Sequence, residues 1–205
     1  MEITWFGHSC FSLKDNKGIR ILTDPFDRSV GYPALNERVD IITISHNHFD
    51  HNYTTDLPGI PAIIDTCGSF DLCGIHITSA PSYHDNFRGA KRGENIIFTY
   101  EIDNFRLCHL GDLGHLLNNA DIARIRPVDV LFIPVGGNYT INAKEASEVA
   151  KCLKAKIILP MHYKTPAISF PLGGVEEFIT LMKNGERIRS STIKIDSLPH
   201  ECNNV

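Results

Sequence analysis

The 205-residue sequence lacks the segments that would anchor it in a membrane or export it. No apolar run approaches the ~20 residues that span a bilayer. Met1 leads into Glu-Ile-Thr-Trp-Phe, without the basic start and long apolar stretch of a signal peptide. There is also no C-x-x-C pair, and six scattered cysteines indicate reduced thiols better than a disulfide framework. We therefore expect a cytoplasmic protein without a membrane span.

An excess of positive charge is also missing. The chain carries 20 Lys+Arg against 24 Asp+Glu, a formal net charge of −4, so it lacks the basic surface of a dedicated nucleic-acid binder. Hydrophobic residues make up 42% and charged residues 21%, which is enough apolar material for a sizeable core. Because we find no repeat, low-complexity segment or linker, residues 1–205 are predicted to form a single domain.

The pattern of apolar residues predicts many strands with helices between them. Strands are predicted over residues 3–6, 10–13, 19–23, 39–44, 62–64, 75–78, 95–102, 106–110, 130–134, 156–159 and 192–195. Turn residues at 15–18 and 103–104 predict two hairpins. This mixture is typical of a layered α/β domain.

Three helices are predicted in the second half. The first covers residues 118–125 and ends before Pro127. The second begins at Asn142, which forms a capping-box pattern with Glu145. The third covers residues 174–184, with Gly185 as its C-cap.

Residues 46–51, His-Asn-His-Phe-Asp-His, carry the strongest chemical signal and follow a predicted buried strand. Neutral imidazole and carboxylate are ligand types that suit zinc, iron or manganese. Four such side chains within this short segment are too crowded for core packing, because each buried group would need its own hydrogen-bond partner. The alternative is a surface loop that happens to be rich in histidine.

Three more residues of the same kind follow other predicted strands. His84, Asp112 and His162 each come just past the end of an apolar run. In layered α/β folds, ligands gather at the carboxyl ends of strands. Taken singly, His84 or His162 is better interpreted as a hydrogen-bonded histidine, but together with residues 46–51 the three residues predict one convergent site.

The order of these motifs resembles the metallo-β-lactamase superfamily. The match includes His84, the Gly-Asp pair that ends at Asp112, and Pro-Met-His-Tyr at 160–163. Trp-Phe-Gly-His-Ser at 5–9 and Thr-Asp-Pro at 23–25 are similar to a branch that contains phosphorylated-ascorbate lactonases and N-acyl-phosphatidylethanolamine phospholipase D. The resemblance spans nearly the whole chain and implies a four-layer αββα sandwich with its metals at one edge.

The resemblance also implies a site for two divalent metal ions. It assigns the ligands to three sets: His46, His48 and His84 on the first metal, Asp50, His51 and His162 on the second, and Asp112 as the bridge. Zinc is the default for such ligands, while manganese, iron or nickel would also fit. The di-iron flavoprotein branch has Glu at the position of His48, which disfavours a redox function.

Such a site predicts a binuclear metal-dependent hydrolase. Two divalent ions balanced by Asp50, Asp112 and a bridging hydroxide keep a net positive charge, which lowers the pKa of bound water towards ~7. The same charge favours a small anionic substrate with an ester-type bond, either a phosphodiester or a lactone. His109 is a further candidate catalytic residue, as proton donor to the leaving group, although a core histidine with one hydrogen bond is the favoured interpretation.

Five other residues are expected near the ligands. His8 and Asp24 are predicted to hydrogen-bond metal-bound side chains and orient them, unless Asp24 only starts the turn at Pro25. Arg88, Asn138 and Lys164 are predicted to bind the anionic substrate. The alternatives are a solvated charged turn at Arg88 and, at Asn138, a tight turn that needs its glycines for steric reasons.

Two other functions remain open at this point. A nuclease of the same fold is disfavoured because the chain has no appended basic domain. A metal-binding sensor or scaffold without turnover is the second alternative. Because the chain is too short for large lids, a homo-oligomer that completes the site is also considered.

Overall fold

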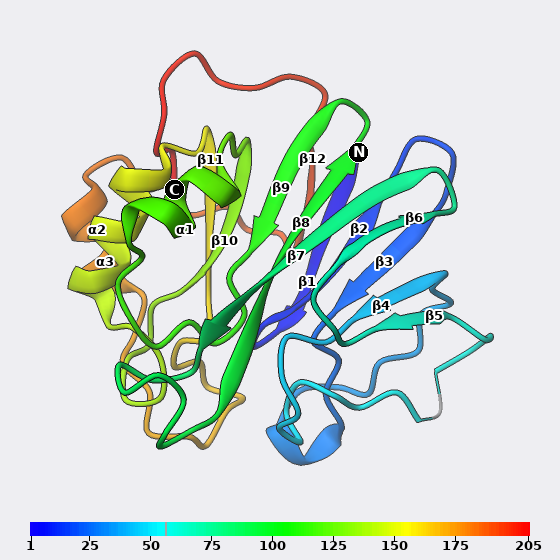
Figure 1. The fold of residues 1–205 in the computed structure, drawn as a ribbon, viewed down its shortest axis with the longest axis horizontal. Coiled ribbons are helices and arrows are strands. Elements are labelled where there is room, and N and C mark those ends of the chain that lie inside the picture. The colour runs from blue at the N-terminus through cyan, green and yellow to red at the C-terminus, as the bar shows by residue number, and fades with distance from the viewer. Residues whose placement is uncertain (56) are drawn as a thin grey trace.

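The computed structural model describes residues 1–55 and 57–205, which form two six-stranded sheets packed face to face (Figure 1). In spatial order the first sheet comprises β12 (Thr192–Lys194), β1 (Glu2–Gly7), β2 (Cys10–Lys14), β3 (Arg20–Thr23), β4 (Ile41–Thr43) and β5 (Ala62–Ile64). The second comprises β11 (Ile157–Met161), β10 (Val130–Pro134), β9 (Phe105–His109), β8 (Glu94–Ile102), β7 (Ile75–Tyr83) and β6 (Ser69–Leu72).

Strand direction decides where the functional loops emerge. In the first sheet β2 is antiparallel to both β1 and β3, and β3 is parallel to β4, so β1, β3 and β4 all run the same way. In the second sheet β9, β10 and β11 are parallel, and β8 is antiparallel to both β7 and β9. The loops that follow β7, β9, β10 and β11 therefore leave from one edge of that sheet.

The core between the sheets joins these edges. Leu13, Ile21 and Ile41 of the first sheet pack in one buried cluster with Phe98 and Phe132 of the second. Burying a large apolar side chain contributes about 1.5–3 kcal/mol. The same contacts that stabilise the sandwich thus fix the relative positions of the two loop-bearing edges.

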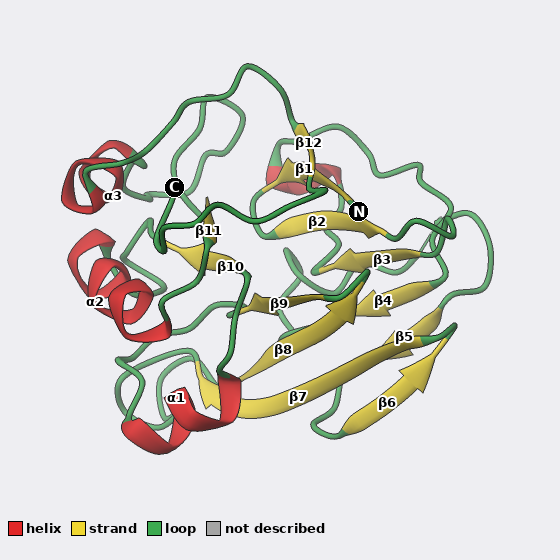
Figure 2. Cartoon of the chain, turned by 90° about the horizontal axis from the view of Figure 1, so that it is seen from above, coloured by secondary structure: helices red, strands yellow, loops and turns green. Residues whose placement is uncertain are grey.

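The α-helices cover the outer face of the second sheet (Figure 2). They are α1 (Asn119–Ile125), α2 (Ala143–Leu153) and α3 (Glu176–Met182). Val149 and Leu153 of α2 pack with Leu131 and Ile133 of β10. In the described part of the chain, no helix has both the length and the apolar character needed to cross a membrane.

The outer face of the first sheet has a thinner cover. It consists of the 3₁₀ helix η1 (Arg28–Val30) and loop residues such as Ile168 and Leu172, which pack on Leu22 and Ile42. Two mixed sheets with helices outside them confirm the expected layered α/β sandwich.

The predicted strands are all present, and the local signals explain several element ends. Asp103 and Asn104 have φ values of 51° and 66°, the conformation that a two-residue hairpin turn needs. Asn142 and Glu145 form the expected capping box at the start of α2, since each side chain accepts the other residue's N–H.

One expectation about the elements is wrong, and one strand was not predicted. The third helix ends at Met182, where Lys183 turns into the left-handed region with a φ of 68°, so Gly185 is not its C-cap. The strand β6 was missed because Ser69 and Asp71 are exposed and leave only two apolar residues to signal it.

Candidate metal centre

Six loops bring their polar side chains to the shared edge of the two sheets. They follow β1, β3, β4, β7, β9 and β11, and they supply His8, Asp24, His46, His48, Asp50, His51, His84, Asp112 and His162. All of these side chains are buried except that of His48. The structure thus gathers the seven predicted ligands, and the one exposed imidazole marks the side of the centre that faces solvent.

Asp112 lies at the middle of this group. Its Oδ2 atom lies 3.1 Å from Nε2 of both His84 and His162. The Nε2 atoms of His51 and His46 follow at 3.4 and 3.9 Å. Four imidazoles from three different loops therefore turn the same ring edge towards one carboxylate oxygen, as a bridging carboxylate would require.

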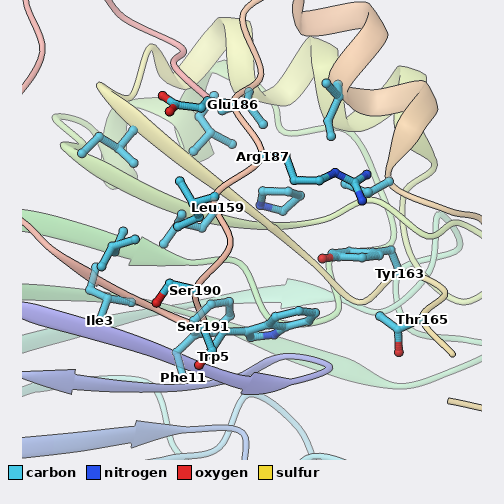
Figure 3. A pocket seen from close by; sticks show the side chains of 18 of the residues that line it. Ile3, Trp5, Phe11, Leu159, Tyr163, Thr165, Glu186, Arg187, Ser190 and Ser191 are labelled. Atoms are coloured by element: carbon cyan, nitrogen blue, oxygen red, sulfur yellow. The ribbon is translucent and has the colours of Figure 1, made fainter. Parts of the chain in front are cut away.

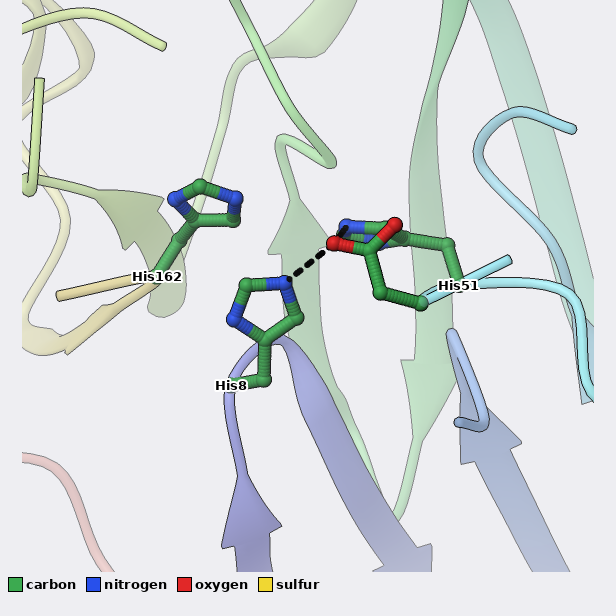
Figure 4. A group of neighbouring side chains, drawn as sticks. His8, His51 and His162 are labelled. Atoms are coloured by element: carbon green, nitrogen blue, oxygen red, sulfur yellow. Dashed lines mark hydrogen bonds and ion pairs between the residues drawn. The ribbon is translucent and has the colours of Figure 1, made fainter. Parts of the chain in front are cut away.

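The remaining ligands divide into two groups around this carboxylate. Within each group all donor atoms lie within 4.8 Å of one another: His46, His48 and His84 form one, and His8, Asp50, His51 and His162 form the other. These groups coincide with the predicted first and second ligand sets, with His8 added to the second. Figure 4 shows the rings of His8, His51 and His162, which belong to the second group.

The donor set fits divalent cations. His46 Nε2, His51 Nε2 and Asp112 Oδ1 are buried and have no hydrogen-bond partner among the described residues. Buried polar atoms without a partner are rare, because each costs about 1–3 kcal/mol. Imidazole nitrogen and carboxylate oxygen are the atoms that zinc and related ions coordinate, so bound cations would satisfy all three.

Asp24 sets which ring nitrogen faces the centre. Its Oδ2 accepts hydrogen bonds from Ser45 Oγ at 2.7 Å and from His51 Nδ1 at 3.0 Å. Because Ser45 has already donated its hydroxyl proton, His46 Nδ1, 2.9 Å from Ser45 Oγ, must donate to that oxygen. Both imidazoles therefore carry a proton on Nδ1 and turn Nε2 towards the centre, which is the nitrogen that each neutral ring would offer to a cation.

Burial and charge set the protonation states here. Burial, together with the neighbouring His51, lowers the pKa of His46 to about 3, so this imidazole is neutral and able to bind a cation. Burial would raise the pKa of Asp112, but the neighbouring His162 and His51 imidazoles outweigh it and hold the pKa well below its usual value. Asp112 is therefore a carboxylate at neutral pH.

His8 contacts the second group directly. Its Nε2 lies 3.0 Å from Asp50 Oδ2, the contact drawn as a dashed line in Figure 4. Its backbone has a φ of 51°, an uncommon conformation for a residue with a side chain. The carbonyl of His8 accepts hydrogen bonds from the Trp5 indole at 3.0 Å and the His162 N–H at 3.3 Å. The fold thus holds His8 against a predicted ligand.

His109 does not fit its predicted role as proton donor to a leaving group. The Gly111 N–H donates to His109 Nδ1 at 3.1 Å, so the ring proton resides on Nε2. Nε2 then donates to the Ser9 carbonyl at 2.9 Å. Since backbone groups occupy both ring nitrogens, we assign His109 to the packing between β9 and the segment after β1.

Comparison with known proteins identifies the family. The family model described as "Beta-lactamase superfamily domain" matches residues 2–162. The chain belongs to the metallo-β-lactamase superfamily. Within that superfamily it groups with the UPF0173 metal-dependent hydrolases.

Two of these relatives are similar over nearly the whole chain. A protein of Methanoculleus marisnigri is 31% identical and covers 92% of this chain and 92% of its own. One of Carboxydothermus hydrogenoformans is 30% identical and covers 86% of this chain and 91% of its own. A crystal structure of a superfamily protein from Thermotoga maritima has 41% identity and a TM-score of 0.84, covering 98% of this chain and 94% of that one. The metallo-β-lactamase fold is thereby confirmed.

Asp85 of this chain organises the loop that carries Arg88. Its two carboxylate oxygens accept backbone hydrogen bonds from residues 87, 89, 91 and 92 at 2.7–2.9 Å. These bonds outweigh the opposing effect of burial and lower the pKa of Asp85 to about 2. Arg92 extends from the loop and donates to the Asn138 carbonyl at 3.0 Å. Arg88 and Asn138 are both exposed on these joined loops.

The ammonium group of Lys164 is hydrogen-bonded to the backbone of its own loop. Its ammonium donates to the carbonyls of Ile168 at 2.6 Å and Phe170 at 3.0 Å. These bonds close the loop that follows β11. We therefore assign Lys164 to the shape of that loop, in place of the predicted contact with substrate.

Two important residues were missed from the sequence. Ser45 links Asp24 to His46, and its place directly before the first ligand was a signal that could have found it. Asn95 accepts the Asp112 N–H at 2.9 Å and donates to the Leu110 carbonyl at 2.9 Å. Nothing near Asn95 in the sequence indicates this role, because its partners lie 15 and 17 positions away.

A separate cavity of about 630 Å³ lies between β1, β11, α3 and residues 186–193 (Figure 3). Trp5, Phe11, Leu159 and Tyr163 provide much of its apolar wall. Its described lining includes none of the seven metal-ligand candidates. The cavity is therefore separate from the candidate metal centre.

Proposed function

We propose that this chain is a binuclear metal-dependent hydrolase that cleaves an ester-type bond, a phosphodiester or a lactone, in a small anionic substrate. The observation that carries the proposal is the position of Asp112 between two groups of ligands, with four imidazole Nε2 atoms 3.1–3.9 Å from one of its oxygens. A hydrogen-bonded core would not leave His46 Nε2, His51 Nε2 and Asp112 Oδ1 buried without partners.

The seven candidate ligands would hold two cations. His46, His48 and His84 would hold the first, Asp50, His51 and His162 the second, and Asp112 both. Bound there, two divalent ions would lower the pKa of water towards ~7 and stabilise the negative charge of the transition state. Zinc is the metal we propose first, and manganese, iron or nickel accept the same ligand types.

The chain's own groups prepare this chemistry. Asp24, directly and through Ser45, holds Nδ1 of His51 and His46, so that Nε2 of both rings faces the centre. His8 holds one oxygen of Asp50, so the other keeps a fixed direction. Because these groups are buried, their geometry is set before a substrate arrives.

An anionic substrate agrees with the surroundings of the centre. The loop fixed by Asp85 carries Arg88 and Lys91, four and seven positions after His84, and these cations can pair with a phosphate or carboxylate. The similarity of residues 5–9 and 23–25 to lactonases and a phospholipase D supports the same class of bond. A cytoplasmic location and a homo-oligomer remain predictions from the sequence.

The test is turnover by zinc- or manganese-loaded protein on a panel of lactones, carboxylic esters, small phosphodiesters and a structured RNA. We expect hydrolysis of a small ester, and we expect Asp112→Asn to abolish it. Cleavage of RNA alone would favour the nuclease. A fully loaded protein that turns over nothing on the panel would favour a sensor or scaffold.

A further inference from the structure

One aromatic side chain in the ligand segment is directed outward. Phe49 lies between His48 and Asp50 and is 57% exposed. An exposed apolar group next to convergent polar side chains is typical of a ligand-binding surface. The backbone of Phe49 is fixed on both sides, since His51 donates its N–H to the His48 carbonyl at 3.0 Å.

A second aromatic ring connects Phe49 to the metal centre. The ring centroid of Phe170 lies 6.1 Å from that of Phe49, and the two planes meet at 79°. On its other side, Phe170 lies 5.9 Å from the ring of His8, at 75°. Phe49 and Phe170 therefore form a continuous apolar wall that runs from the surface to the second group of ligands.

The loop that carries Phe170 is held in shape. Lys164 donates its ammonium to the Phe170 carbonyl and its N–H to the Gly173 carbonyl, at 3.0 and 2.8 Å. Thr165 is hydrogen-bonded to Tyr32 at 2.7 Å, which ties the start of the loop to the segment after η1. The position of Phe170 is thus set in advance, as a binding wall requires.

The opposite side of the centre has a different character. His84 of the first ligand group donates its N–H to the Gly93 carbonyl, which places the loop of Arg88 and Lys91 beside that group. The centre therefore has a cationic loop on the side of the first group and an apolar wall on the side of the second.

We propose that Phe49 and Phe170 form a subsite for an apolar group, aryl or alkyl, which the anionic substrate carries next to the bond that is cleaved. The proposal rests on the proposed function and specifies its substrate class. One aromatic contact of this kind corresponds to roughly a tenfold gain in affinity.

The experiment measures binding of phenylphosphonate and methylphosphonate to the zinc-loaded protein by calorimetry. The two anions share a head group and differ in the apolar part, and neither has to be turned over. We expect phenylphosphonate to bind roughly tenfold more tightly. In Phe49→Ala the ratio of the two dissociation constants should fall towards one, and Phe49→Leu should keep most of the preference.

Ile60→Ala is the matched control. Ile60 is fully exposed and precedes β5, whose start pairs with the start of β4, so it lies at the sheet edge opposite the ligands. This variant should keep the wild-type ratio. The zinc content of each variant is measured in parallel. If Phe49→Ala loses zinc, the ratio of the two dissociation constants is measured in Phe170→Ala instead.

Equal affinity of the wild type for the two phosphonates would overturn the subsite while the proposed function stands. A preference that survives both Phe49→Ala and Phe170→Ala would also overturn it. If neither phosphonate binds the zinc-loaded protein, the anionic substrate class falls, and the subsite falls with it.

Discussion

Asp24 accepts a hydrogen bond from His51 Nδ1 at 3.0 Å, across 27 positions of sequence. Through Ser45 the same carboxylate also fixes the tautomer of His46. One buried side chain at the end of β3 thus orients a ligand in each of the two groups. Metal affinity should therefore depend on a residue that touches no metal.

Replacing Asp24 with Asn tests this dependence. The carboxylate accepts the Ser45 N–H on Oδ1 and the Ser45 hydroxyl and His51 Nδ1–H on Oδ2, whereas Asn replaces one of these oxygens with an NH₂ donor. We expect zinc affinity to fall about 10–100-fold, as for other partners of metal-bound imidazoles. The measurement is a competition titration against a chelator. Asp71→Asn, at an exposed carboxylate paired with His76, should bind zinc as the wild type does, and an equal affinity in Asp24→Asn would refute the role.

Gly114→Ala should disturb the centre from outside the ligand set. A Cβ atom at Gly114 would collide with the backbone of His84 and Asp85, which cannot rotate away. We expect a loss of about 1–3 kcal/mol in the free energy of unfolding, measured with urea, together with weaker zinc binding.

Gly68→Ala is the control for that change. Its Cβ would meet only the end of the Phe70 side chain, at 3.0 Å, and that ring can move. If Gly114→Ala proves as stable as Gly68→Ala, the close packing of β9 and β7 loops around His84 is not what fixes this ligand.

Asp85→Ala should loosen the loop that carries Arg88. Without the carboxylate, the backbone N–H groups of residues 87, 89, 91 and 92 lose their acceptor. We expect faster hydrogen exchange at these amides, while those of α2 serve as an internal reference and do not change. Exchange that stays as slow as in the wild type would show that other contacts order this loop.

Removing metal should destabilise the whole protein. The centre leaves buried nitrogen and oxygen atoms without partners, so a bound cation is linked to folding. At a hundredfold excess of free zinc over its dissociation constant, the stabilisation is about 2.7 kcal/mol. Thermal unfolding before and after chelation measures this, and Asp112→Asn should show a much smaller shift. An equal Tm before and after chelation would mean that no cation is bound to the folded state.

The sequence was sufficient for the parts that depend on local patterns. Each apolar run formed a strand, and the convergence of the seven candidate residues could be predicted because each lies just past a strand that ends at the same edge. The capping box at Asn142 and the turn at Asp103 could also be predicted, since their hydrogen bonds join residues close in sequence.

The side-chain roles that depend on contacts between residues far apart in sequence could not be predicted from the sequence. Asn95 binds the backbone of Asp112, and the roles of His109 and Lys164 follow from carbonyls that only the folded loops bring near. The exposure of Phe49 likewise could not be inferred, because an aromatic residue among ligands is as compatible with the core as with the surface.

A zinc titration of the metal-free protein, with bound metal counted per chain, tests the central claim most directly. The arrangement around Asp112 predicts two equivalents in the wild type and in Asp71→Asn, and fewer than two in Asp112→Asn. A wild-type chain that saturates with a single ion, or that binds none, would contradict the account.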